Sequence, residues 1–335
     1  MTSGYGFPML ARPILSAEVK GHPASRSLRI VSLADFRTGP WQTIDRLQGN
    51  DVLPYCLDVK ERRSLYCRAG SVREAQRAPF YYLHLRQRAT TLFAIPWEHG
   101  RVFERGAATP CFIFSVGRCG STLLVDALRA GGACAVSEPD FFTQAVATYL
   151  FEGPLYSGYA ELARVLGDVT GDLLAAVSKP NEQRAFIKLR AQCCKAPRLI
   201  VGENGGKTIF LIRQFPTWAA STVPVSTISA RGLVDRYIEG LQALQWLQRN
   251  TDCHFITYEE LTTHTERSLQ DLKTTFGLAR TLGIAHADSQ RGTPLSRKAA
   301  RDEDARAQLL HRAERLWIEA RPAELLRHLR LADYC

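Results

Sequence analysis

A stretch of eighteen residues, CFIFSVGRCGSTLLVDAL at 111–128, constrains the fold more than any other part of the sequence. The mostly apolar residues Cys111 to Val116 predict a buried strand, and an apolar pattern of helical spacing begins near Ser121. Between them lies a turn bounded by Gly117 and Gly120. A glycine-rich turn from strand to helix directs backbone N–H groups at one point, where the helix dipole adds positive charge. The segment therefore predicts a phosphate-binding loop.

This loop differs from the one found in nucleotide triphosphatases. Their pattern, G-x-x-x-x-G-K-[ST], uses the Lys for the terminal phosphates and the Ser or Thr for magnesium. With Gly120 as the second glycine, Ser121 stands in the Lys position, and Ser115 stands in that of the first glycine. The positive charge has moved to Arg118, inside the turn. The sequence RCGST, which begins at this Arg, resembles the 5′-phosphosulfate loop of the sulfotransferase superfamily, [KR]-S-G-[ST]-T.

The resemblance implies 3′-phosphoadenosine 5′-phosphosulfate (PAPS) as the co-substrate. The loop residues expected to hold its 5′-phosphate are Gly117, Arg118, Cys119, Gly120, Ser121 and Thr122. Arg118 would also neutralise charge on the leaving group and on the transferred sulfuryl group. Cys119 replaces the usual Ser as a small residue. A reactive thiol is the alternative for Cys119, because a helix N-terminus lowers the pKa of a thiol.

A second segment, TIFLIRQFPTWAAST at 208–222, agrees with the first. Ile209 to Ile212 form a continuous apolar run, as in a strand covered on both faces. Arg213 ends this strand, and Pro216 suits the first turn of a helix. Ser221 follows the Arg by eight residues. In sulfotransferases an Arg and a Ser in these places bind the 3′-phosphate, because guanidinium offers a bidentate fork and the hydroxyl adds a donor.

Sulfuryl transfer requires a base that takes the proton of the acceptor. One branch of the family uses His, but none of the eight His residues lies within 120–252. Another branch uses a Glu after the second strand, and Glu138 follows Arg118 by twenty residues. A desolvated Glu can act as a base near neutral pH, and Asp140 is the second candidate. Lys188, in the strand-like AFIKLR, is the third predicted catalytic residue, because a lysine there approaches the sulfuryl oxygens in several family members.

Two further segments are weaker. Cytosolic family members close over the nucleotide with a glycine-rich basic loop, and the chain has comparable chemistry at 289–298 without the R-K-G-x-x-G pattern. Arg291 and Ser296 are the candidates there. The segment CHFITYEEL at 253–261, followed by a helix ending near Gly277, supports the fold and carries no predicted chemistry.

The residues before the loop are an extension, 1–105, that we expect to pack on a sulfotransferase domain at 106–335. The extension contains strand-like RIVSLADF (29–36) and RSLYCRA (63–69), and a helix-like segment at 72–96. Its aromatic residues either pack on the core or form one wall of the acceptor pocket. Helices are expected at 141–175, where Phe141, Phe142 and Tyr149 would line the crevice, and at 299–331.

Composition limits the partners. The net charge of +10 suits a polyanionic co-substrate, while the scattered basic residues argue against nucleic-acid binding. The nine Cys residues include no C-x-x-C pair, which predicts reduced thiols, a cytoplasmic protein and no zinc or other metal site. Neither a signal peptide nor a membrane span is indicated. A homodimer is left open.

The sequence thus predicts an α/β protein: a three-layer P-loop fold with a mainly parallel central sheet and helices on both faces, an N-terminal extension and C-terminal helices. The expected function is metal-independent sulfuryl transfer from PAPS to a hydroxyl or amine of a small-molecule or carbohydrate acceptor. Two alternatives stay open: a P-loop phosphotransferase of kinase type, and a catalytically inactive relative that binds a nucleotide.

Overall fold

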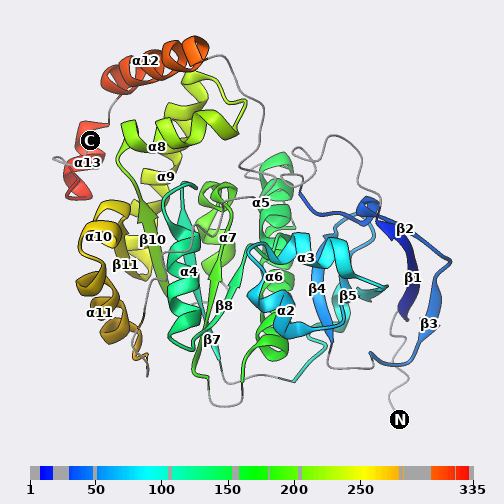
Figure 1. Ribbon diagram of the computed structural model, residues 1–335. Coiled ribbons are helices and arrows are strands. Elements are labelled where there is room, and N and C mark those ends of the chain that lie inside the picture. Colours follow the sequence, from blue (N-terminus) through cyan, green and yellow to red (C-terminus); the bar gives the residue numbers. More distant parts are fainter. Residues whose placement is uncertain are drawn as a thin grey trace.

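The computed structural model describes residues 8–17, 30–47, 51–104, 108–152, 158–179, 182–202, 206–278, 282, 303–320 and 322–331. In these residues two β-sheets organise the chain (Figure 1). One sheet uses strands within 9–96, and the other uses strands within 109–257. The first sheet is antiparallel and the second is parallel. In the parallel sheet alone, the carboxyl ends of all the strands lie at the same edge.

The parallel sheet has the strand order β11-β10-β7-β9-β8. Its strands are β7 (Thr109–Ser115), β8 (Cys134–Ser137), β9 (Arg184–Lys188), β10 (Lys207–Ile212) and β11 (Asp252–Thr257). Every neighbouring pair is parallel. The carboxyl ends of all these strands therefore meet at one edge, which we call the carboxyl edge. In open α/β sheets this is the edge that binds ligands.

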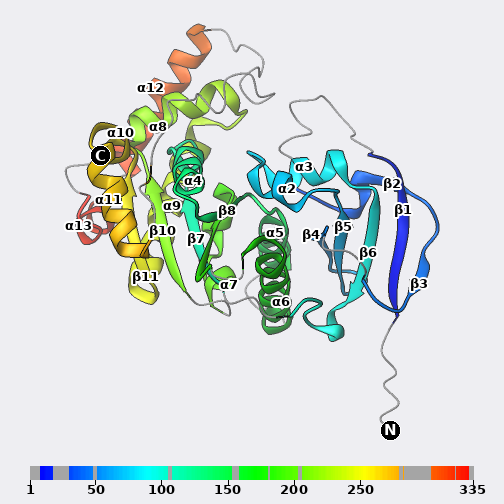
Figure 2. The same ribbon diagram turned by 60° about the horizontal axis from the view of Figure 1, so that its bottom comes forward.

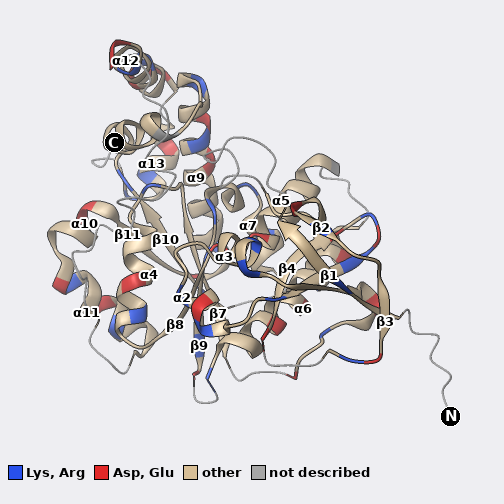
Figure 3. Cartoon of the chain, turned by 45° about the vertical axis from the view of Figure 1, so that its right-hand side comes forward, with Lys and Arg blue, Asp and Glu red and all other residues tan. Residues whose placement is uncertain are grey.

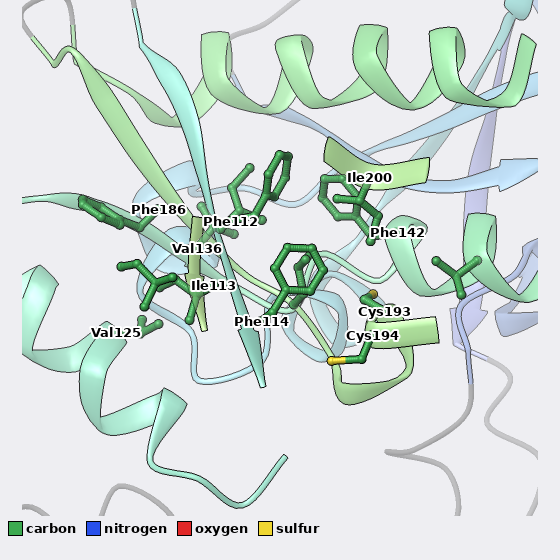
Figure 4. Packing of buried hydrophobic residues seen from close by; sticks show 14 of the residues in the cluster. Phe112, Ile113, Phe114, Val125, Val136, Phe142, Phe186, Cys193, Cys194 and Ile200 are labelled. Carbon is green, nitrogen blue, oxygen red and sulfur yellow. The ribbon is translucent and has the colours of Figure 1, made fainter. Parts of the chain in front are cut away.

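Helices cover both faces of the parallel sheet. On one face, Ile113 points toward Val125 of α4 (Ser121–Ala130), as Figure 4 shows. The ring of Phe112, on the opposite face, lies 5.5 Å from that of Phe142 in α5 (Phe141–Glu152). Successive residues of β7 thus face different helices, as the period of two in a strand requires. The predicted three-layer α/β arrangement with a parallel central sheet is confirmed.

After α5, the described part of the chain contains eight further α-helices. They are α6 (Tyr159–Val177), α7 (Pro197–Val201), α8 (Phe215–Thr222), α9 (Ala230–Asn250), α10 (Tyr258–Thr263), α11 (Thr265–Phe276), α12 (Glu303–Ala320) and α13 (Ala323–His328). The predicted C-terminal helix is present as α12, which packs on α8 and α9 beyond the carboxyl edge (Figure 1). Figure 3 shows that α12 carries charges of both signs.

The antiparallel sheet has the order β2-β1-β6-β5-β4, with β3 beside β1. Its strands are β1 (Met9–Ala17), β2 (Phe36–Thr38), β3 (Gln42–Ile44), β4 (Val52–Asp58), β5 (Arg63–Arg68) and β6 (Thr91–Pro96). Figure 2 shows α5 and α6 between this sheet and the parallel one. The Tyr66 hydroxyl donates to Asp172 Oδ2 at 2.6 Å, and Leu57 N donates to Gln144 Oε1 at 2.6 Å. The N-terminal residues therefore pack on the core through buried hydrogen bonds.

Two predictions for this region are wrong. The segment 72–96 is not one helix: it forms α2 (Val72–Arg77), α3 (Tyr81–Arg88) and then strand β6. Pro79 falls between the two helices, and β6 pairs with β5 on one side and β1 on the other. Within the described part of the predicted strand at 29–36, residues 30–35 do not form a strand, and only Phe36 lies in one, at the start of β2. Leu33–Asp35 form a short 3-10 turn, closed by Ser32 N donating to Asp35 Oδ2 at 2.8 Å.

No helix in the described ranges is long and apolar enough to cross a membrane. Among the same residues, no cluster of three or more His, Cys, Asp or Glu side chains could hold a metal ion.

Candidate active site

The predicted phosphate loop connects β7 to α4 at the carboxyl edge. Its backbone is left-handed at three positions, with φ of 81° at Gly117, 56° at Arg118 and 80° at Gly120. Such a conformation is easy for glycine and uncommon for Arg. Consecutive residues of this kind turn backbone N–H groups toward one concave point. The first turn of α4 begins at this point, and the first N–H groups of a helix point outward along its axis, away from the rest of the helix.

Neighbouring side chains fix the loop. Trp218 Nε1 donates to the Gly117 carbonyl at 2.8 Å, and the Cys119 thiol donates to the same carbonyl at 2.9 Å. The Gly117 N–H donates to Ser115 Oγ at 3.3 Å, so Gly117 supplies the bend while its own N–H is already bonded. Ser121 and Thr122 are buried in the first turn of α4.

Cys119 is not the reactive thiol that the sequence left open. Its side chain is fully buried, and burial raises the pKa of the thiol well above its ordinary value. A protonated, inaccessible thiol is a poor nucleophile. Cys119 therefore serves as a small residue that bonds and fills the loop.

Arg213 lies immediately after β10, as predicted, and its positive charge acts on the guanidinium of Arg118. Burial, and then the nearby charge of Arg213, lower the pKa of Arg118. Arg213 Nε donates to Thr217 Oγ1 at 3.2 Å, and its guanidinium carbon lies 4.3 Å from the centre of the Tyr258 ring. Two guanidinium groups held close together favour an anion between or beside them.

Tyr258 is a site residue that the sequence analysis missed. It begins α10 directly after β11, and its ring lies under Arg213. A Cβ on Gly120 would come within 2.9 Å of Tyr258 Cδ2, so the phosphate loop packs directly on this ring. The same side chain thus contacts both segments that are predicted to bind phosphate. The signal in the sequence was a Tyr at the carboxyl end of a predicted strand, where we expected only structure.

Ser221 is on α8 and half-buried. Its hydroxyl donates to the Trp218 carbonyl at 2.8 Å, one turn earlier in the same helix. A rotation about its side-chain bond is needed before this hydroxyl can donate to a phosphate. The two residues predicted to close over the nucleotide, Arg291 and Ser296, lie outside the described residues.

Glu138 and Lys188 form an ion pair at the carboxyl edge. Lys188 Nζ lies 2.5 Å from Glu138 Oε1, and the Glu138 N–H donates to the Lys188 carbonyl at 2.8 Å. The side chains are 14% and 5% exposed, so the pair is accessible mainly through the carboxylate. Glu138 has φ of 60°. A strained backbone at a non-glycine residue is typical of functional positions.

Asp140, the second candidate for the base, has a structural role. Its side chain is fully buried, with Oδ1 2.8 Å from Arg190 Nη1 and Oδ2 accepting from Val31 N at 2.9 Å. Both oxygens are therefore bonded, and one of them ties the N-terminal extension to the core. An acceptor molecule has no access to this carboxylate.

The N-terminal extension reaches the ion pair at Phe80, the residue that precedes α3. Lys188 Nζ lies 5.8 Å from the centre of the Phe80 ring, and the Arg190 guanidinium lies 5.2 Å from that of Tyr82. Phe80 was not singled out from the sequence. By contrast, Phe141 and Phe142 are wholly buried in the core, so the prediction that they line the crevice is wrong. One surface hollow, lined by His254, Glu260, His264 and Asp271, contains none of the predicted site residues.

No family model and no curated sequence matches the chain. In the structure comparison the chain is similar to sulfotransferases. Mouse sulfotransferase SULT7A1 complexed with PAP aligns with a TM-score of 0.33 and 14% identity, over 58% of this chain and 69% of that one. The sulfotransferase domain of the Synechococcus PCC 7002 olefin synthase aligns at 0.37 and 15%, over 60% and 84%. Retinol dehydratase in complex with androsterone and inactive cofactor PAP aligns at 0.30 and 16%, over 58% and 64%.

Proposed function

We propose that the chain is a sulfotransferase that moves the sulfuryl group of PAPS to a hydroxyl or amine of a small-molecule or carbohydrate acceptor. Adenosine 3′,5′-bisphosphate is the second product. One observation carries the proposal. A loop with its cation inside the turn follows β7, and in the strand order it lies between the guanidinium of Arg213, directly after β10, and the Glu138–Lys188 ion pair at the ends of β8 and β9. The loop and Arg213 would each bind one of the two phosphates of the donor, and the Glu138–Lys188 pair would take the proton of the acceptor.

The strand order sets the direction in which the nucleotide lies. From Arg213 after β10 to Glu138 after β8, the sheet spans three strand intervals, or about 14 Å at the usual strand spacing. The phosphate loop after β7 lies between them. In this arrangement Arg213 and Ser221 bind the 3′-phosphate, and the loop binds the 5′-phosphate. The sulfuryl group then points toward Lys188 and Glu138.

The loop and its cation stabilise the transition state. As the bond between sulfur and the bridging oxygen breaks, negative charge develops on the 5′-phosphate. Arg118 and the N-terminal N–H groups of α4 are fixed in place before the reaction, so they offset this charge without reorganising. The hydroxyls of Ser121 and Thr122 are buried at the same point and add donors.

Glu138 takes the proton of the acceptor. The attacking oxygen or nitrogen forms a bond to sulfur as its proton moves to the Glu138 carboxylate, and the 5′-phosphate leaves with the electron pair of the broken bond. Lys188 holds Glu138 in place before the donor binds. The negative sulfuryl oxygens would then compete with Glu138 for the ammonium, which frees the carboxylate to act as the base.

A phosphotransferase of the P-loop type is less consistent with these residues. Its loop would carry a Lys where Ser121 stands, whereas the cation of this loop is Arg118. A strand-end carboxylate for magnesium would also be needed, and Glu138 is held by Lys188 instead. In an inactive nucleotide-binding relative, no reaction would require a carboxylate with the strained backbone and the ion pair of Glu138.

The test is turnover of PAPS by the full chain in the presence of EDTA. Release of adenosine 3′,5′-bisphosphate is measured by chromatography with a panel of phenols, sugars and amines. Acceptor-dependent release that EDTA does not affect supports the proposal. Transfer of the terminal phosphate of ATP, dependent on magnesium and without turnover of PAPS, would overturn it in favour of the phosphotransferase.

A further inference from the structure

Four buried aromatic side chains form a cluster beside the candidate nucleotide site. We call them the aromatic cluster: Phe215 and Trp218 of α8, Tyr237 of α9, and Trp317 of α12. The first three are fully buried, and Trp317 is 4% exposed. The cluster joins a helix near the C-terminus to the helix that follows Arg213 (Figure 1).

Trp317 is the main contact of α12 with this cluster. Its ring stacks on Phe215 with 4.8 Å between centroids and 16° between planes, and it meets Tyr237 edge-on at 5.2 Å. Within the described part of α12, only Ala313 and Trp317 are buried. These residues are four apart, so they form one stripe on the helix. Partly buried apolar residues of α12, such as Leu309 and Leu316, also pack on the core, and Trp317 is the large side chain of the helix that is buried within the aromatic cluster.

Trp218 and Tyr237 of the cluster each donate a hydrogen bond to a backbone carbonyl in one of the two segments that are predicted to bind phosphate. Trp218 Nε1 donates to the Gly117 carbonyl of the loop at 2.8 Å. The Tyr237 hydroxyl donates to the Arg213 carbonyl at 2.7 Å. Trp218 and Tyr237 lie 5.3 Å apart, and each also contacts Phe215. A shift of any ring in this close-packed group would move at least one of the two carbonyls.

We infer that Trp317 is a positioning residue for nucleotide binding: by docking α12 against the aromatic cluster, it fixes the backbone of Gly117 and Arg213 in the geometry that binds two phosphates. The inference rests on the proposed function and adds a regulatory element to it. Coupling of this kind is reciprocal, so a bound nucleotide should in turn hold α12 more firmly on the protein.

The left-handed loop explains why such support is needed. Arg118 keeps a backbone conformation that is unfavourable for a residue with a Cβ, so contacts with its surroundings must offset the cost of this conformation. A site of this kind binds tightly only when its supporting side chains are themselves locked by packing. The aromatic cluster supplies that packing on the side of the loop that faces α8.

The test is calorimetric titration of the full chain with adenosine 3′,5′-bisphosphate. Trp317→Leu removes the stacked ring and keeps an apolar side chain, whereas Trp317→Phe keeps an aromatic contact. We expect the Kd of Trp317→Leu to rise about tenfold, which corresponds to about 1.4 kcal/mol, and that of Trp317→Phe to rise less. Ile318→Ala is the matched control, because Ile318 is the next residue of α12 and is 72% exposed.

The outcomes separate this inference from the proposed function. Equal Kd values for wild type and Trp317→Leu, with only a lower melting temperature in the variant, would show that Trp317 is ordinary core and overturn the inference. A wild type that gives no heat with the bisphosphate would overturn the proposed function and this inference together.

Hydrogen exchange on the unmodified protein keeps the inference testable if Trp317→Leu does not fold. Adding saturating bisphosphate should slow exchange of the α12 amides as well as those of the loop. Slower exchange in the loop with unchanged exchange in α12 would contradict the coupling.

Discussion

Glu138 and Arg118 illustrate how single residues can mark a site. In the described part of the chain only four non-glycine residues have positive φ, and these two are among them. Both stand at the carboxyl edge, one after β8 and one after β7. Their strained backbone is maintained by neighbours: Glu138 N–H bonds to the Lys188 carbonyl, and the loop is held at Gly117 by Trp218. Strain supported in this way is expected where geometry matters for chemistry.

Replacing Glu138 with Gln tests its role as the base. The amide keeps the size of the side chain and cannot take a proton, so we expect turnover to fall by about 10²–10⁴-fold. The affinity for adenosine 3′,5′-bisphosphate should stay within a factor of about two, because Glu138 contacts no phosphate in the proposed arrangement. Glu239→Gln, at a surface ion pair with Lys195, is the control. Weaker binding with unchanged turnover of bound PAPS would contradict the assignment.

Arg213→Ala tests the 3′-phosphate site. Loss of a charge-assisted contact should weaken adenosine 3′,5′-bisphosphate by about 1.5–3 kcal/mol. Adenosine 5′-phosphosulfate lacks the 3′-phosphate, so its affinity should change far less. Titration of both ligands against the variant measures the difference, and Arg231→Ala, at an exposed pair on α9, is the control. Equal weakening of the two ligands would remove Arg213 from this role.

At the scale of elements, the parallel sheet was predictable, whereas in the antiparallel sheet β5 is the strand that the sequence indicated, as the segment 63–69. Strands β7 and β10 are continuous apolar runs followed by turns, and such patterns can be recognised from the local sequence alone. Strand β6 was taken as the end of a helix, because nothing near Thr91–Pro96 in the sequence indicates pairing with β1 and β5. Tyr258 and Phe80 were missed as site residues for the same reason. Their roles come from contacts with distant segments, at Arg213 and at Lys188.

The residue that precedes α3, Phe80, contributes to the candidate site. The ring lies beside the Lys188 ammonium and should orient it by a cation–π contact worth about 0.5–2 kcal/mol. Phe80→Leu is therefore expected to lower turnover by about three- to thirtyfold without changing the Kd of the bisphosphate. Phe93→Leu is the matched control, because Phe93 makes the same kind of contact with Arg68, away from the site. A similar loss of turnover in both variants would point to general destabilisation.

At the scale of the whole molecule, the buried thiols give a pH dependence. Burial raises the pKa of every described Cys, from about 11 for Cys253 to well above the ordinary value for Cys119. In the unfolded chain these thiols ionise near pH 8.5. Above that pH the unfolded state has lost protons that the folded state keeps, so the free energy of unfolding must fall as pH rises.

Urea unfolding under reducing conditions checks this dependence. The midpoint should decrease from about pH 7.5 to about pH 9.5, in the range where unfolded thiols lose their protons. A midpoint that stays constant or rises over this range would show that the thiols are not buried in the folded protein.

The central claim is that the carboxyl edge binds an adenine nucleotide phosphorylated at both the 3′ and 5′ positions. A thermal-shift series with adenosine 3′,5′-bisphosphate, 5′-AMP, and ATP with magnesium tests it most directly, because a ligand that binds the folded state raises the melting temperature. We predict strong stabilisation by the bisphosphate and little by the other two. Stabilisation by ATP with magnesium in place of the bisphosphate, or by none of the three, would contradict the account.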